Sequence, residues 1–452
     1  MNNRQDAIYD ASSLGVSKML ILGLQHMFAM FGATILVPIL VNNYFHGEGM
    51  SVQTTLLCAG AGTLIFHLCT RFKVPAFLGS SFAFLGGFAA VAELETGRFA
   101  GMSYGEKLPY ACGGIVVAGL LYFVLAGLIK VVGVQKVMRF LPPVVTGPII
   151  IGIGLGLAPS AIANCSMNWP LALVALVTVI IFNIWGKGIF KIIPVLLGVV
   201  VAYAIAINMQ QWGLTNADGS MIIDTQAIAE APIVGFPQIA MAKFDLTVIL
   251  TMAPIAIAAM MEHIGDISAI SATTGRNFIE DPGLNRTLLG DGLATALAGF
   301  FGGPANTTYG ENTGVLELSK VYDPKVIRLA AIYAVVLGFV PKVAQVFGSM
   351  PTAIVGGISF ILYGMISAVG VRNIVENQVD FKKSRNLIIM AIILVIALGT
   401  NGISFSIGET TITLTSLALA SIVGILLNAV LPGNDYQFGK NQLGDEYQGI
   451  HL

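Results

Sequence analysis

Long apolar stretches recur along almost the whole chain and constrain its fold more than any other feature. A run of roughly 17 to 25 apolar residues can cross a bilayer as a helix, and about fourteen such runs are present. Only 10% of the 452 residues are charged, against about 25% in soluble proteins. The sequence therefore excludes a water-soluble multidomain protein, and its net charge of -1 indicates neither a nucleic acid nor an acidic partner.

The basic residues give the orientation of these runs. Nineteen of the 23 Lys and Arg residues fall on one set of alternating loops, and four fall on the other set. Cytoplasmic loops collect Lys and Arg, so we expect both termini in the cytoplasm. The apolar runs span roughly 17–41, 51–70, 75–92, 109–131, 143–160, 170–186, 192–210, 245–264, 287–303, 305–319, 324–347, 351–370, 386–400 and 410–432.

The predicted fold is an all-α multi-pass membrane protein of about fourteen segments in two inverted repeats of seven. Seven segments per half require the second half to enter the membrane upside down. Two pairs of motifs support the repeat: Gln25-His26 matches Glu262-His263, and Pro75-Ala76 matches Pro304-Ala305. The second pair lies in the third and tenth segments, which are short and interrupted by Pro and Gly.

The third and tenth segments are predicted to contain short extended stretches, each leading into a half-helix. Interrupted segments at corresponding positions of two halves indicate a transporter binding site. Irregular backbone at membrane depth is stable only when it is buried in protein or lines a cavity. The half-helices would direct free backbone N–H groups at that site.

The candidate functional carboxyl groups in or next to the predicted spans are Glu262, Asp266, Asp291 and Glu311. Buried charge is costly, so such residues indicate function, and without a basic partner they favour the protonated form. Glu262 and Asp266 share one helix face. Asp291 is interpreted as a cap or a bond to a neighbouring segment. His26 and His263 are interpreted as packing residues.

Carboxylates and helix N-termini together match a small planar molecule that carries both N–H and C=O groups. The aromatic rings of Phe82, Tyr309 and Tyr363 could stack on its face. The spacing of His, Cys, Asp and Glu indicates no metal site, and no cofactor is predicted. The residues alone identify this pharmacophore and no particular compound.

The chain resembles the nucleobase-ascorbate transporter family, and within it the bacterial uracil permeases, from about Gly23 to about Ile425. In its tenth segment the family has Gln, Glu or Pro, then Asn-x-Gly, four variable residues and Thr. This chain has Glu311-Asn312-Thr313-Gly314 there, with Ser319 in place of Thr. The other matching pieces are Leu24 to Thr34, Pro75 to Phe84, Glu262 to Asp266, Asp281 to Leu284 and Asn306 to Tyr309.

The resemblance implies a homodimer in the inner membrane, surrounded by lipid, that imports uracil together with a proton. Each subunit would have a core domain that moves against a gate domain. The core would comprise residues 1–131 and 245–347, and the gate residues 132–244 and 348–432. A cytoplasmic tail would follow at 433–452.

The resemblance also assigns roles to individual residues. In relatives Gln at the first signature position goes with xanthine or urate and Glu with uracil, which makes Glu311 the residue that selects the base. Glu262 and Glu311 would accept N–H bonds, and the backbone of Phe82 and Gly310 would donate. Tyr309 and Tyr363 would pack nearby and Ala33 would leave room. Glu262, Asp266 and Glu311 would carry the coupling proton, although some relatives have His at the position of Asp266.

Three alternatives remain at this stage. A purine base such as xanthine or urate could be the substrate within the same family. An anion exchanger could share the inverted-repeat plan, but paired carboxylates oppose anion binding. An intramembrane enzyme is disfavoured because Glu262-His263 is not a metal-binding pattern and no nucleophile grouping is present.

Overall fold

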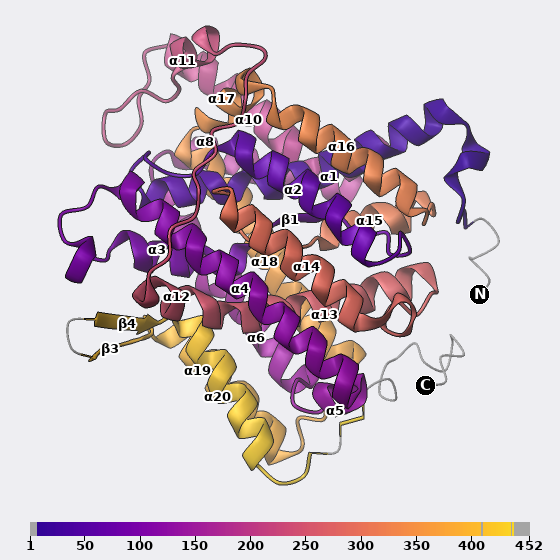
Figure 1. The fold of residues 1–452 in the computed structure, drawn as a ribbon. Helices are drawn as coiled ribbons and strands as arrows, with labels where there is room; N and C mark the ends of the chain where they lie inside the picture. Colours follow the sequence, from indigo (N-terminus) through magenta and orange to yellow (C-terminus); the bar gives the residue numbers. More distant parts are fainter. Residues whose placement is uncertain (1–6, 408–409, 435, 438–452) are drawn as a thin grey trace.

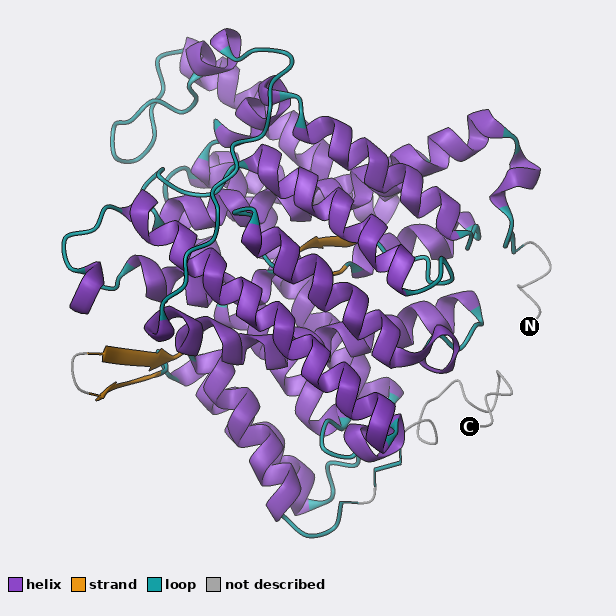
Figure 2. Cartoon of the chain, viewed as in Figure 1, coloured by secondary structure: helices purple, strands orange, loops and turns teal. Residues whose placement is uncertain are grey.

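The computed structural model describes residues 7–407, 410–434 and 436–437, and most of these residues are helical (Figure 1 and Figure 2). Within them, seven helical spans are long and apolar enough to cross a membrane. A bent helix pair and four shorter apolar helices add to these. The structure thus confirms a predominantly helical multi-pass membrane protein. The tail predicted at 433–452 lies almost wholly outside the described residues.

One group of helices packs together through small residues. At Gly119 a Cβ would approach the backbone of Ala296 and Gly292 to 2.6 Å, so glycine permits the close contact of two helices. A Ser103–Glu106 capping box starts one of them. The group comprises α1 (Val16–Tyr44), α2 (Val52–Cys69), α4 (Tyr104–Val132), α14 (Leu284–Phe300) and α16 (Pro324–Gly338).

A second group of helices packs around α18 (Thr352–Glu376). Pro143 and Pro194 start two of these helices, at a position where the missing N–H costs no hydrogen bond. The other members are α6 (Pro143–Gly156), α7 (Ala158–Ser166), α8 (Trp169–Trp185), α10 (Pro194–Gln211), α19 (Ser384–Gly399) and α20 (Ser416–Val430).

Two short strands lie at the centre of the molecule, surrounded by helices (Figure 2). Strand β1 (Leu78–Ser80) pairs antiparallel with β2 (Asn306–Thr308), with Gly79 opposite Thr307. A 3-10 turn (Phe82–Phe84) and α3 (Leu85–Ala92) follow β1, and α15 (Gly310–Ser319) follows β2. The predicted extended stretches and half-helices are both confirmed.

The strand–helix segments contact the helix that carries two of the predicted site residues. That helix is α13 (Ala256–Thr274), and it continues α12 (Leu246–Met252) through a 3-10 turn (Ala253–Ile255) that contains Pro254. Helix α13 packs against α15 and β2 of the strand–helix segments, against α4 of the first helix group, and against α6 and α20 of the second. It therefore lies at the boundary of the two helix groups.

Two predicted spans differ from the observed elements. The run 324–347 is broken before Pro341, and α17 (Pro341–Gly348) turns 84° away from α16 because proline cannot continue the helix. The run 410–432 begins as a strand. Strands β3 (Ile403–Ile407) and β4 (Thr410–Leu414) form an antiparallel hairpin that the alternating Thr, Ser and apolar residues favour, and α20 starts after it.

Short elements complete the described chain. The residues between the predicted spans 192–210 and 245–264 contain one helix and then an extended segment. In that segment the N–H groups of Ala242 and Lys243 donate to the carbonyls of Phe300 and Pro109. That segment therefore lies across the ends of α14 and α4. The remaining elements are α5 (Val134–Met138), α9 (Ile189–Ile192), α11 (Thr225–Glu230), two 3-10 turns (Ala11–Leu14, Gly97–Phe99) and a π turn (Ile279–Gly283).

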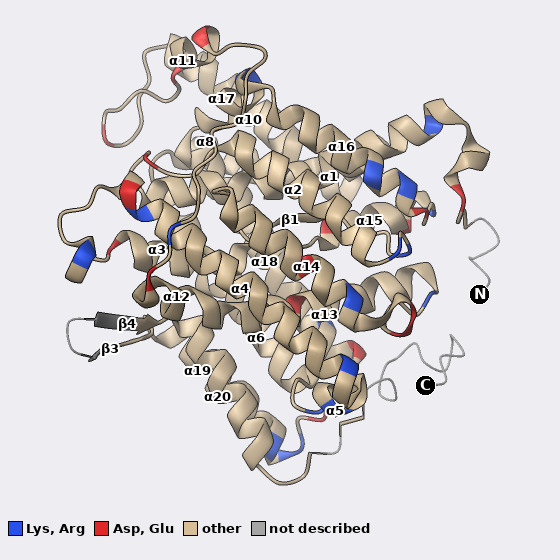
Figure 3. Cartoon of the chain, viewed as in Figure 1, with Lys and Arg blue, Asp and Glu red and all other residues tan. Residues whose placement is uncertain are grey.

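Charged residues lie mostly at helix ends and in loops, as Figure 3 shows. A few acidic positions near α13 and α14 are the exception in the interior. Asp266 is 6% exposed and Asp291 is fully buried. The fold therefore keeps carboxyl groups away from water at the place where the two helix groups meet.

Candidate functional site

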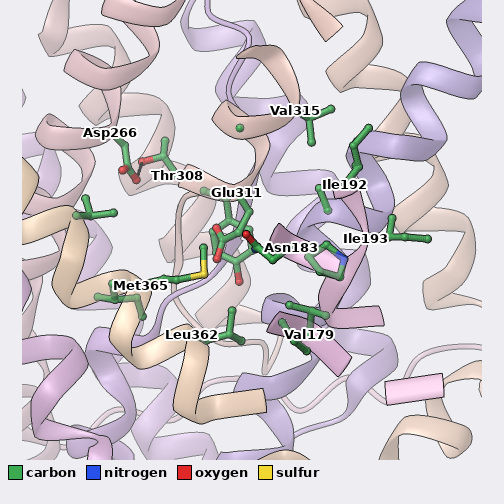
Figure 4. A pocket seen from close by; sticks show the side chains of 18 of the residues that line it. Val179, Asn183, Ile192, Ile193, Asp266, Thr308, Glu311, Val315, Leu362 and Met365 are labelled. Atoms are coloured by element: carbon green, nitrogen blue, oxygen red, sulfur yellow. Dashed lines mark hydrogen bonds between the residues drawn. The ribbon is translucent and has the colours of Figure 1, made fainter. Parts of the chain in front are cut away.

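A cavity of about 340 Å³ lies between the two helix groups. Strand β2 and helices α13 and α15 form one wall, and α8, α9, α10 and α18 form the opposite wall. Figure 4 shows Glu311 near its centre, with Asn183 and Met365 close by. The cavity thus brings together residues that are more than one hundred positions apart in sequence.

Two half-helices begin at this cavity. Phe82, at the start of the 3-10 turn that leads into α3, and Gly310, the first residue of α15, both line it. Neither start has a side-chain cap: Ser81 and Tyr309 occupy the cap positions without accepting a bond from the following turn. The first N–H groups of a helix have no partner within the helix. Both segments therefore present uncapped helix starts at the site, as predicted.

Three carboxyl groups line the cavity: Glu262, Asp266 and Glu311. The hydroxyl of Thr308 donates to Asp266 Oδ2 at 2.8 Å. The buried Oε2 atom of Glu262 has no hydrogen-bond partner among the described residues. Glu311 lies in the first turn of α15, where the helix dipole favours negative charge. The site therefore offers hydrogen-bond acceptors beside uncapped donors.

The predicted aromatic residues take three different positions. Phe82 lines the cavity, and Tyr363 packs edge-on against it with ring centroids 6.0 Å apart. Tyr309 also lines the cavity, but its hydroxyl donates to the carbonyl of Ser80 at 2.9 Å. Tyr309 thus joins the two strand–helix segments. Tyr363 and Ala33 are buried outside the lining residues.

Two other polar pairs lie inside the protein beside the site. The Nδ1 atom of His263 is 3.1 Å from Asp291 Oδ2, and both side chains are fully buried. Asp291 lies within α14 rather than at its cap and contacts His263 of the neighbouring helix α13. Asn312 donates to the carbonyl of His26 at 2.9 Å. The same amide nitrogen of Asn312 lies 3.2 Å from Nδ1 of His26. Both imidazoles are thus fully buried and contact polar side chains of neighbouring segments.

Two basic residues of the cavity were not predicted. Lys191 on α9 and Arg372 on α18 line it together with the three carboxyl groups. A periodic signal for Arg372 was present in the sequence. The cavity-lining residues of α18 recur every three or four positions and end at Arg372, which marks one helix face; they are Leu362, Met365, Ile366, Val369 and Arg372.

In the part of the chain that the structure describes, no group of three or more His, Cys, Asp and Glu side chains is placed to hold a metal ion. The absence of a cofactor stays a prediction. The arrangement of a polar cavity, broken segments and buried carboxyl groups between two groups of membrane helices is typical of secondary transporters. Fold and site therefore define the class of the protein as a membrane transporter.

Comparison with known proteins identifies the family. Residues 17–404 match the model of a family described as the Permease family. This is the nucleobase-ascorbate transporter family, and the chain belongs to it. It is 40% identical to the uracil permease of Bacillus caldolyticus, with 97% of each chain covered. It is 38% identical to a probable uracil permease of Pasteurella multocida, over 92% of this chain and 94% of that protein. The relatives confirm a transporter rather than an enzyme.

A solved structure shows how widely the fold is shared. The transmembrane domain of a cyanobacterial bicarbonate transporter, BicA, superimposes with a TM-score of 0.60 at 15% identity, over 94% of this chain and 99% of that chain. At this identity the likeness is one of fold alone. The fold by itself therefore does not separate a nucleobase carrier from an anion carrier, and the site chemistry must do so.

Proposed function

We propose that this protein imports uracil across the inner membrane by proton symport. The observation that carries the proposal is that Glu262 and Glu311 line the same cavity as the uncapped starts of two half-helices. Uracil has two N–H donors and two carbonyl acceptors on one ring. Paired carboxyl acceptors and backbone donors satisfy both sets.

In the proposed binding mode, Glu262 and Glu311 accept the N–H bonds of uracil. The N–H groups of Phe82 and Gly310 donate to its carbonyls, with Phe82 and Tyr309 against the ring. Tyr363 supports Phe82 through an edge-on ring contact, and the small side chain of Ala33 leaves room for the substrate. The names of the relatives, uracil permease and probable uracil permease, favour this base over a purine.

Proton coupling follows from the same residues. Glu262, Asp266 and Glu311 are three acidic groups that line one cavity, and like charges at short range cannot all remain ionised at little cost. Binding a proton removes part of this charge and allows the loaded site to move through an apolar environment. The proton is the coupling ion, and no other cofactor takes part.

The proposed architecture is fourteen segments in two inverted repeats of seven. The central β1–β2 pair supports it, since each strand precedes a half-helix and the two strands run antiparallel. The two helix groups support a division into a core (residues 1–131 and 245–347) and a gate (132–244 and 348–432). We further propose a homodimer with both termini in the cytoplasm.

Uptake by proteoliposomes that contain the purified full-length chain tests this function. We expect labelled uracil to accumulate when an inward proton gradient is imposed, and a protonophore to abolish accumulation. Unlabelled xanthine or urate in excess should not compete. Competition by a purine would contradict the choice of base, accumulation that persists with the protonophore would contradict symport, and exchange of bicarbonate in place of uracil would establish an anion carrier.

A further inference from the structure

The two walls of the cavity carry opposite charge. Among the described residues that line it, the acidic ones come from α13 and α15 and the basic ones, Lys191 and Arg372, come from α9 and α18. Under the proposed function the acidic wall belongs to the moving core and the basic wall to the gate. The distance between them must therefore change during the transport cycle.

Arg372 is held on α18 without a buried partner. Its Nε atom is 3.8 Å from Glu376 Oε1, one turn further along the same helix, and the two side chains are 54% and 55% exposed. An exposed ion pair of this kind is weak because water screens it. The guanidinium group therefore remains available to the carboxyl groups across the cavity.

Asp266 and Arg372 line the same cavity, from α13 and α18 respectively. The acidic groups around Asp266 are Glu262 on its own helix, Glu311 on α15 and Asp291 on α14, and Thr308 of β2 donates to it. Helices α6 and α20 pack against α13 and contain no charged residue, and His263 is paired with Asp291. Among the described residues that line the cavity, the basic groups are Arg372 on α18 and Lys191 on α9.

We propose that Arg372 is a positioning residue for proton release, a cation fixed on the gate that favours ionised Asp266 while both face the same cavity. An opposite charge close to a carboxyl group favours its charged form. When the core moves away, Asp266 leaves this cation behind and holds its proton more readily. The affinity for the proton thus depends on the position of the core, as a coupled transporter requires. This role rests on the proposed function.

The test compares two measurements on Arg372→Gln in proteoliposomes. Net uracil uptake under an imposed proton gradient requires release of the proton, whereas equilibrium exchange of labelled for unlabelled uracil does not. We expect net uptake to fall about tenfold, and its internal-pH midpoint to rise by about one unit, because one unit corresponds to a tenfold change in proton binding. Equilibrium exchange should change by less than about twofold. Arg372→Lys should restore both the rate of net uptake and its internal-pH midpoint, since both depend on the positive charge at this position.

Lys187→Gln is the matched control. It removes a positive charge from an exposed residue four positions before Lys191, and Lys187 does not line the cavity. Net uptake by this variant should equal that of the unsubstituted protein. An equal fall of net uptake and exchange in Arg372→Gln, or an unchanged pH midpoint, would overturn the role of Arg372. If the unsubstituted protein neither exchanges nor accumulates uracil, the proposed function itself fails.

Discussion

The two strand–helix segments at the centre of the molecule share a backbone plan but differ in chemistry. Residues 78–92 and 306–319 each run from a three-residue strand into an uncapped helix, and the strands pair with one another. In the first segment the helix start consists of apolar side chains, among them Phe82 and Phe84. In the second, Glu311 stands in the first turn.

This difference teaches that backbone and side chain contribute separately to the site. Both segments offer N–H donors, which any sequence able to form an uncapped helix start would provide. The carboxyl acceptor is present on one side alone, where the dipole of α15 also favours it. We infer that the first segment supplies general hydrogen-bond donors and the second segment supplies selectivity.

The largest effect is expected from a substitution that disrupts the packing between the two segments. A Cβ added at Gly79 would overlap the ring of Tyr309, whereas one added at Gly310 would lie 3.9 Å from Asp266 Oδ1, an ordinary contact. Overpacking costs about 1–3 kcal/mol or more. Gly79→Ala should therefore lower the unfolding temperature of the purified protein strongly and abolish uracil binding, while Gly310→Ala should unfold close to the unsubstituted protein. Equal unfolding temperatures would show that the segments are not packed as described.

An intermediate effect is expected from removing a hydroxyl group of the two strands. Thr308 donates to Asp266, and Ser80 donates to the backbone carbonyl of Thr34 at 2.9 Å. A hydrogen bond to a charged group contributes about 1.5–3 kcal/mol, so Thr308→Val should reduce proton-driven uracil uptake about tenfold. Ser80→Ala should leave the pH profile of uptake unchanged. A shifted pH profile of uptake in Ser80→Ala, with an unshifted profile in Thr308→Val, would contradict this account, because the first segment would then act on the proton and the second would not.

The sequence predicted both segments because Pro and Gly interrupt apolar runs there, and it predicted Glu262, Asp266 and Glu311 because buried carboxyl groups are costly. It did not predict Arg372, since that residue lies two positions beyond the end of the predicted span 351–370. The 84° break before Pro341 and the hairpin at 403–414 were also missed. Both regions were predicted as spans from their apolar content alone. Pro341 indicates a helix break, and the alternating polar and apolar residues at 403–414 indicate strands.

The far ends of the two segments are also held differently. Helix α3 ends at the carbonyl of Ala92, which accepts a hydrogen bond of 3.0 Å from the buried Lys107. Lys107 also donates to Glu95, and this bond lowers the pKa of the Glu95 carboxyl. Helix α15 ends near Val321, which forms a bridge with Ile8 of the N-terminal segment. One end thus depends on a buried lysine side chain and the other on backbone pairing with the N-terminal segment.

The smallest expected effect concerns the exposed ion pair between Lys325 and Asp10, which lies in the same N-terminal region. Lys325 donates to Asp10 at 2.9 Å, and its hydrogen bond is the main cause that lowers the pKa of Asp10 to about 2. The folded-state pKa is depressed, so the contribution is present above the ordinary pKa of about 3.9 and is lost as the pH falls towards 2. Asp10→Asn should lower the unfolding temperature slightly and equally at pH 8 and pH 6. The difference should shrink below about pH 4.

An Asp10→Asn difference that disappears between pH 8 and pH 6 would contradict the assignment of this contact. Glu280→Gln is the control, because Glu280 is an exposed carboxyl group that accepts a hydrogen bond from the neutral amide of Asn277. Its unfolding temperature should follow that of the unsubstituted protein throughout.

The binding constant of uracil for Glu311→Gln, measured by titration calorimetry on the purified protein, tests the central claim most directly. Glu317→Gln serves as the control, since Glu317 is an exposed residue of the same helix that does not line the cavity. We predict that Glu311→Gln weakens uracil binding by about 10- to 100-fold, the loss of a charge-assisted hydrogen bond, while Glu317→Gln binds as the unsubstituted protein does. Unchanged affinity in Glu311→Gln would contradict the role of α15 in selecting the base.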